Sequence, residues 1–130
     1  MIKKTLTFNG IINRLNNFWK KNGCIIMQPT DMEVGAATFH PTTFFNAINK
    51  KTWKAAYTQI CRRPSDNQYS KDSNRLPIFH QYQVIIKPSD LNIQKLYLDS
   101  LRKIDIDLNK NDIKFIEDNW ESPTLGASGI

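Results

Sequence analysis

Residues 54–87, KAAYTQICRRPSDNQYSKDSNRLPIFHQYQVIIK, decide the fold of this chain. The run 54–61 favours a β-strand, the stretch 64–77 is almost wholly polar, and a second β-favouring run covers 78–87 until Pro88 ends it. This order predicts two strands joined by a long loop. Such a strand–loop–strand favours an antiparallel sheet over a doubly wound parallel one, so we expect an α+β fold in which helices flank the sheet.

Before this stretch, residues 8–22 are predicted to form an amphipathic helix. Its apolar positions recur at three-to-four spacing: Phe8, Ile11, Ile12, Leu15, Phe18 and Trp19. Gly23 suits a left-handed helix end, and residues 24–28 are expected to form a short strand closed by Pro29.

The rest of the chain holds shorter elements in a single domain of 130 residues. In chain order we predict a loop over 31–42, a short helix from a Thr42 cap to about Lys50, a helix over 91–103 capped by Ser89 or Asp90, and a strand over 113–117. The apolar runs are far too short to span a bilayer, and no apolar stretch follows Lys3 and Lys4 as in a secretory signal. We therefore expect a cytoplasmic protein with no membrane partner.

The chain is basic, with a formal net charge of +6 and a pI of about 9.4. A basic surface attracts polyanions such as tRNA or nucleotides. The basic residues are mostly lysine rather than arginine, however, and an AT-rich genome would also favour lysine over arginine. The charge is therefore weak support for a nucleic-acid partner.

Several common chemistries lack their motifs here. The chain has no glycine-rich phosphate loop and no Ser-His-Asp set. Cys24 and Cys61 lack the spacing of metal ligands, so we expect no metal site and interpret both as small buried side chains. His40, which precedes a proline, and His80, on a predicted strand, are interpreted as structural.

The unusual feature is a pair of arginines, Arg62 and Arg63, at the end of the first strand and an aromatic pair on the second. Guanidinium groups match phosphate, and a ring of Phe79 or Tyr82 offers a surface on which adenine can stack. Strand alternation puts Phe79, Gln81 and Gln83 on one face and His80, Tyr82 and Val84 on the other. These residues alone do not decide the function, because double arginines are usually surface charges and strand aromatics are usually core.

Separate blocks of the sequence resemble known motifs. FWKKNGCIIMQP (18–29) is similar to motif 1 of the class II aminoacyl-tRNA synthetases, and residues 57–87 are similar to motif 2. More narrowly, five blocks resemble the alpha subunit of the tetrameric bacterial glycyl-tRNA synthetase. They are QPTDMEVGAATFHP (28–41), RRPSD (62–66), NRL (74–76), QYQVIIKPS (81–89) and EDNWESPTLGA (117–127). The resemblance covers nearly the whole chain and implies the amino-terminal part of a class II catalytic domain.

The resemblance also implies an activity and partners. The chain would be the alpha chain of a glycine–tRNA ligase, which activates glycine with ATP to glycyl-adenylate and transfers it to tRNA. Magnesium would assist at the phosphates, and two alpha chains would assemble with two beta chains. Adenylation of this kind needs alignment and charge neutralisation rather than a covalent nucleophile.

The site roles follow the motif positions. Arg62 or Arg63, with Arg63 preferred, would contact the α-phosphate as the catalytic arginine, and Arg75 would reach the γ-phosphate. By the same resemblance Phe79 would stack on adenine, with Tyr82 as second choice.

Further roles come from the same blocks. Asp66 would meet the adenine edge, and Gln81 and Gln83 would face the same pocket. Gly23 and Pro29 would lie at the interface between two alpha chains. The glycine pocket would be bordered by Glu33, Gly35, Thr38, Glu117, Asn119, Trp120 and Glu121.

The chain departs from the family in two respects. Motif 3 and its arginine are absent from these 130 residues, and Ser128 stands where the family has an aromatic residue. We therefore expect the isolated chain not to activate glycine. Two other interpretations stay open: a truncated, non-catalytic synthetase-like protein that binds nucleotide or RNA, and an adenylating enzyme of the same fold for another amino acid.

Overall fold

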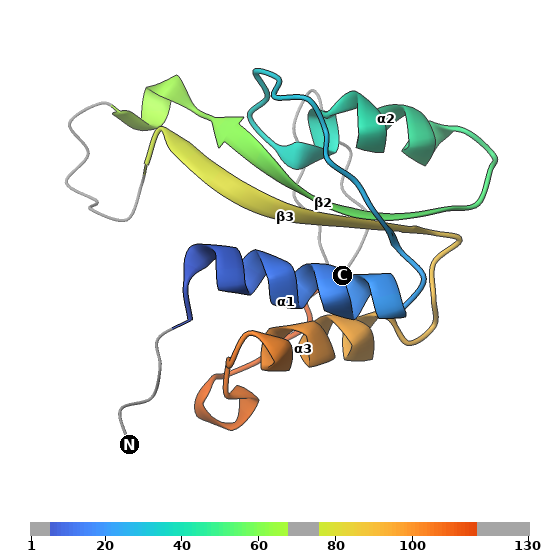
Figure 1. Cartoon of the computed structure of the whole chain (residues 1–130), viewed down its shortest axis with the longest axis vertical. Coiled ribbons are helices and arrows are strands. Elements are labelled where there is room, and N and C mark those ends of the chain that lie inside the picture. Colours follow the sequence, from blue (N-terminus) through green and yellow to red (C-terminus); the bar gives the residue numbers. More distant parts are fainter. Residues whose placement is uncertain (1–5, 68–75, 117–130) are drawn as a thin grey trace.

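The computed structural model describes residues 6–67 and 76–116, in which helices lie on both faces of a small sheet (Figure 1). The helices and strands are α1 (Phe8–Lys21), β1 (Ile25–Ile26), α2 (Pro41–Ile48), β2 (Trp53–Arg62), β3 (Ile78–Lys87) and α3 (Ile93–Lys103). Short 3-10 turns cover Ala37–Phe39, Pro64–Asn67 and Leu108–Lys110. No helix within the described ranges is long and apolar enough to cross a membrane.

Strands β2 and β3 form the antiparallel pair that the sequence predicts. Their register runs from Trp53 opposite Lys87 to Arg62 opposite Ile78. β3 has the predicted bounds, and β2 extends one residue further at each end. The α+β fold is confirmed. The sheet is mixed rather than antiparallel throughout, because β1 pairs with β2 in parallel.

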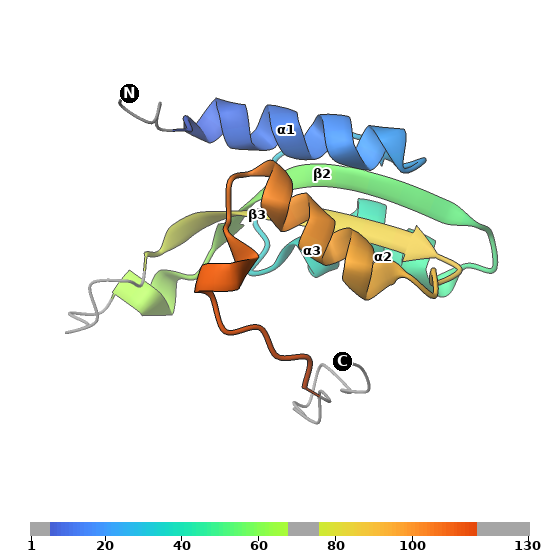
Figure 2. The ribbon, with the colours of Figure 1, turned by 90° about the horizontal axis from the view of Figure 1, so that it is seen from below.

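One face of the sheet is covered by α1 and α3, which lie side by side beneath it (Figures 1 and 2). The apolar stripe of α1 supplies the buried Leu15 and Trp19 to this core. Val84 and Ile86 of β3 pack against them, as does Ile93 of α3. Each fully buried apolar side chain of this size contributes about 1.5–3 kcal/mol, so this layer holds the hairpin to its helices.

Helix α1 begins and ends as its sequence indicates. The Thr7 hydroxyl accepts a hydrogen bond from the Gly10 N–H at 3.1 Å, which satisfies a donor in the first turn. At the other end Gly23 has φ 87°, the left-handed conformation that a residue without Cβ adopts at little cost. The chain can therefore turn sharply from α1 into β1.

The opposite face of the sheet is covered by α2 and the turn Ala37–Phe39 (Figure 1). The prediction that Thr42 caps α2 is wrong, because the helix begins at Pro41 and His40 is its cap. The Thr42 N–H donates to His40 Nδ1 at 3.1 Å, and His40 Nε2 lies 3.1 Å from the Thr30 carbonyl oxygen. The structural interpretation of His40, which is 3% exposed, is confirmed.

Two further predicted elements differ from the structure. Helix α3 begins at Ile93 rather than at residue 91, because Asp90 accepts from the Asn92 N–H at 2.8 Å and forms a turn before the helix. Residues 113–116 are exposed and pair with no strand within the described chain, so the strand predicted from 113 is wrong over these residues. A β-favouring composition does not make a strand without a partner edge.

The ammonium of Lys87 joins the end of β3 to the end of α2. Lys87 Nζ donates to the carbonyl oxygens of Asn46 at 2.8 Å and Ala47 at 3.0 Å, and also to the Asn49 carbonyl. These carbonyls belong to the last turn of the helix, where the helix dipole favours a positive charge. Lys87 therefore fixes α2 to the sheet.

Replacing this ammonium tests its contribution to stability. Lys87→Met should lower the free energy of unfolding by about 1–2 kcal/mol, because several helix carbonyls lose a charged donor. Urea denaturation followed by circular dichroism measures the change. Lys51→Met, an equal change of charge at an exposed site nearby, is the control and should leave the midpoint almost unchanged. Equal midpoints for the two variants would contradict the assigned role of Lys87.

Candidate active site

The side chains of β2 and β3 divide the hairpin into two faces. On the α2 side, the register places three pairs opposite each other: Cys61 and Phe79, Gln59 and Gln81, and Tyr57 and Gln83. We call these six residues the polar face. The predicted grouping of Phe79, Gln81 and Gln83 on one face is confirmed.

The turn Ala37–Phe39 is attached to the polar face by its own backbone. The Ala37 N–H donates to Gln81 Oε1 at 2.8 Å, and the Tyr57 hydroxyl donates to the Ala37 carbonyl at 3.0 Å. Tyr57 is 1% exposed, its oxygen lies 2.5 Å from the Thr43 hydroxyl, and burial raises its pKa. Gln81 is thus a structural acceptor as well as a predicted pocket residue.

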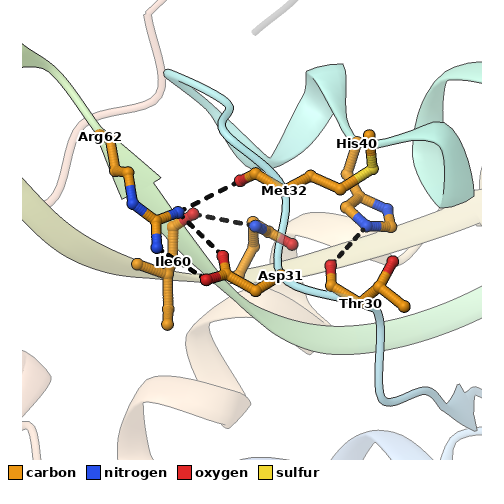
Figure 3. Close-up of polar contacts among 7 residues, drawn as sticks. Thr30, Asp31, Met32, His40, Ile60 and Arg62 are labelled. Carbon is orange, nitrogen blue, oxygen red and sulfur yellow. Dashed lines mark hydrogen bonds and ion pairs between the residues drawn. The ribbon is translucent and has the colours of Figure 1, made fainter.

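Arg62 binds the segment that precedes this turn (Figure 3). Its guanidinium donates to both carboxylate oxygens of Asp31, at 2.8 and 2.7 Å, and to the Met32 carbonyl at 3.3 Å. The hydrogen bonds from Arg62 lower the pKa of Asp31. The Arg62 N–H also donates to the Val34 carbonyl at 2.9 Å, so both backbone and side chain hold this segment to the end of β2.

Arg63 lies differently, over the ring of Phe79. Its Cζ is 5.0 Å from the centroid of that ring, a distance typical of a cation–π contact. Arg63 Nε donates to the Gly35 carbonyl at 3.0 Å. Within residues 6–67 and 76–116 Arg63 forms no ion pair with a carboxylate, whereas Arg62 is paired with Asp31. Of the two arginines, Arg63 is therefore the one directed at the polar face.

The predicted glycine-pocket residues that can be described lie on the same segment. Glu33 and Thr38 are exposed, and Gly35 between them is half-buried. Among the described residues, a Cβ at Gly35 would meet only the Arg62 carbonyl oxygen, at an ordinary 3.8 Å, so packing within this part of the chain does not require glycine. The structure thus brings together Gly35, Arg63, Phe79 and Gln81.

Other predicted positions fall elsewhere. Asp66 lies in the turn Pro64–Asn67, directly after the arginines. The remaining predicted residues, Arg75, Glu117, Asn119, Trp120 and Glu121, lie outside the described residues.

Tyr82 does not belong to this group. Its hydroxyl donates to Asn16 Oδ1 of α1 at 2.9 Å, and its ring packs against the core on the side of α1 and α3. Burial raises its pKa. Because it faces away from Phe79, the second choice for an adenine-stacking ring is withdrawn.

The family to which the chain belongs can now be stated. The family described as glycyl-tRNA synthetase alpha subunit matches residues 8–130, which include every element described above. The chain belongs to the glycyl-tRNA synthetase alpha subunit family. It is accordingly a chain of a multi-subunit aminoacyl-tRNA synthetase, a ligase that uses glycine and tRNA in protein biosynthesis. The structure is compatible with part of a class II synthetase domain.

Within this synthetase chain, sequence reasoning missed the residues that hold the site together. These residues are Asp31, Tyr57 and Thr43. Asp31 had a signal, because it lies in the block 28–41 that carries the resemblance and is the carboxylate closest in sequence to Glu33. Tyr57 and Thr43 had none, because their contact depends on how α2 packs over the sheet.

Both cysteines of the synthetase chain are buried, as predicted. Cys24 is 4% exposed and Cys61 is 0% exposed, and burial raises the pKa of each thiol. Cys61 Sγ lies 3.5 Å from Gln81 Oε1 on the polar face. The thiol therefore forms part of the floor of the site rather than a nucleophile at its surface.

A hollow of the described part of the synthetase chain lies away from these residues. It has a volume of about 710 Å³ and lies on the other side of β3, where Tyr82, Ile93 and Phe115 line it. Its surface is mostly apolar, and its Lys114 pairs with Asp112 at 2.9 Å. Phosphate recognition requires cations and hydrogen-bond donors, which the polar face offers at Arg63 and this mostly apolar hollow does not.

Gly23 and Pro29 flank β1, at the end of α1 and after the strand. Their role between two alpha chains stays a prediction. No group of three or more His, Cys, Asp or Glu side chains in residues 6–67 and 76–116 is arranged to hold a metal ion.

The Asp31–Arg62 pair predicts a titration. Because Arg62 lowers the pKa of Asp31 below its ordinary 3.8, pairing stabilises the folded chain above that pH and is lost as the pH falls through the lowered pKa. In a carbon-13 NMR titration, the Asp31 carboxyl should protonate below 3.8 in the native chain and close to it in Arg62→Met. Asp99, whose pKa is lowered by Lys95 and Arg102, is the control and should not change. A titration midpoint of Asp31 that is the same in the native chain and in Arg62→Met would contradict the pairing.

Proposed function

We propose that the polar face binds ATP and that glycine is activated there as glycyl-adenylate before transfer to tRNA. The observation that carries the proposal is the position of Arg63. The Gly35 carbonyl and the Phe79 ring hold its guanidinium at the end of the antiparallel hairpin, in a chain of the glycyl-tRNA synthetase alpha subunit family.

Arg63 is proposed to contact the α-phosphate. In adenylation a carboxylate oxygen of glycine attacks the α-phosphorus, an oxygen–phosphorus bond forms, and the bond to the leaving pyrophosphate breaks. Negative charge grows on the phosphate oxygens during this step, and a fixed guanidinium beside them stabilises it. Because Arg62 is paired with Asp31, Arg63 is the better candidate.

Phe79 is proposed to carry the adenine ring. It is half-buried on the polar face, beside the arginine that would take the phosphates. Stacking on an aromatic ring is worth about 1–3 kcal/mol per base and fits a flat, bent nucleotide. Arg63 Nε would stay on the Gly35 carbonyl while the rest of the guanidinium turns from the ring toward the phosphates as the base enters.

The remaining parts of the proposal come from the family. Magnesium would enter with the phosphates of ATP, whose charge it neutralises. We propose assembly of two alpha with two beta chains in the cytoplasm, where tRNA is charged. Glycine would lie near Gly35, between the exposed Glu33 and Thr38. In the assembled alpha and beta chains, glycine-dependent exchange of pyrophosphate into ATP tests the activity, and exchange that ignores glycine would refute it.

The arginine assignment predicts which part of the nucleotide loses affinity. Arg63→Met should weaken ATP binding about 10–100-fold, because a charged hydrogen bond worth about 1.5–3 kcal/mol is lost. Adenosine, which lacks phosphate, should bind as before. Isothermal titration calorimetry measures both. Arg14→Met, which removes an arginine paired with Asp105 on the other side of the sheet, is the control. Equal ATP affinity for native chain and Arg63→Met would refute the assignment.

The aromatic assignment predicts a different pattern. Phe79→Leu should weaken ATP and adenosine alike, by about fivefold or more, because a leucine offers no stacking surface. Phe45→Leu, at an exposed position on α2, is the matched change and should alter neither affinity. Loss of ATP binding with unchanged adenosine binding would show that Phe79 acts only through Arg63.

A further inference from the structure

We propose that the ion pair between Asp31 and Arg62 is a positioning device for Arg63. It holds residues 31–35 against the end of β2, so that the Gly35 carbonyl fixes the Arg63 guanidinium beside Phe79. This inference rests on the proposed function of Arg63. It assigns Asp31 and Arg62 a role away from the reacting atoms.

The first support is the geometry of the pair. Two parallel N–H···O contacts of 2.8 and 2.7 Å join one guanidinium to one carboxylate (Figure 3). A bidentate contact fixes orientation as well as distance, which a single contact does not. With Arg62 donating to the Met32 carbonyl as well, its guanidinium is committed to this segment.

The second support is the continuity of contacts along the segment. Arg62 holds Asp31 and Met32 with its side chain and Val34 with its backbone, and Arg63 holds Gly35. Every contact of residues 31–35 with these two arginines except that of Asp31 ends on a backbone carbonyl. Substitution of Asp31 therefore removes two of these hydrogen bonds from the segment without removing an arginine.

The third support is that position and charge predict opposite effects. A carboxylate close to a phosphate site repels the phosphates, so neutralising a bystander Asp31 should leave ATP affinity unchanged or raise it. If Asp31 positions Arg63, neutralising it should weaken ATP binding. The sign of the change separates the two roles.

A spectroscopic measurement tests positioning without ATP. In chain carrying nitrogen-15 arginine, the Nε–H signal of Arg63, assigned by its loss in Arg63→Lys, should exchange slowly because it donates to Gly35. Asp31→Asn should speed this exchange by about tenfold or more. Arg62→Lys keeps the charge but loses the bidentate fork, and should act in the same direction. Asp99→Asn, an equal change of charge on α3, is the control and should have no effect.

ATP affinity then links position to binding. Asp31→Asn should weaken ATP about tenfold with adenosine unchanged, and should change ATP affinity less than about twofold in the Arg63→Met background. Unchanged Arg63 exchange, or tighter ATP binding by Asp31→Asn, would overturn the inference. A native chain that binds no ATP would refute the proposed function instead, and the exchange measurement would still decide whether the ion pair orders Arg63.

Discussion

The two-residue repeat of side chains along β2 and β3 governs where each group of the site can lie. Tyr82, Val84 and Ile86 point into the core between the sheet and α1, so Phe79 and Gln81 must point the other way. A register shift of one residue would exchange the two faces and would expose the apolar side chains to water. The same apolar packing that stabilises the fold therefore also fixes the side of the sheet on which Arg63 finds Phe79.

The parallel pairing of β1 with β2 explains why the polar face is covered. Parallel neighbours need a connection that crosses over the sheet, and here residues 27–52 make that crossing on the side opposite α1 (Figure 1). A crossing backbone brings buried N–H and carbonyl groups that need partners. At Ala37, Gln81 and Tyr57 supply them, which accounts for polar side chains in the middle of a sheet face.

The sequence predicted best what depends on local pattern. The predicted bounds of β3 are correct because a long β-favouring run and Pro88 mark them, and Gly23 is predictable because a left-handed helix end favours glycine. It did worse where distant segments meet. Histidine is an uncommon cap, so the sequence predicts Thr42 as the cap where the structure has His40. The parallel direction of β1 cannot be deduced from a strand of 2 residues.

In the site, too, features set by local pattern were predictable and contacts between distant segments were not. The face shared by Phe79, Gln81 and Gln83 followed from alternation alone. Asp31 is not predictable from the sequence, because its partner Arg62 lies 31 residues away and only the crossover brings them together.

Burial of the thiols also controls how readily they react. An alkylating reagent attacks thiolates, and burial keeps Cys61 both protonated and out of reach. The rate at which Cys61 is alkylated therefore reports how often residues 27–52 separate from β2.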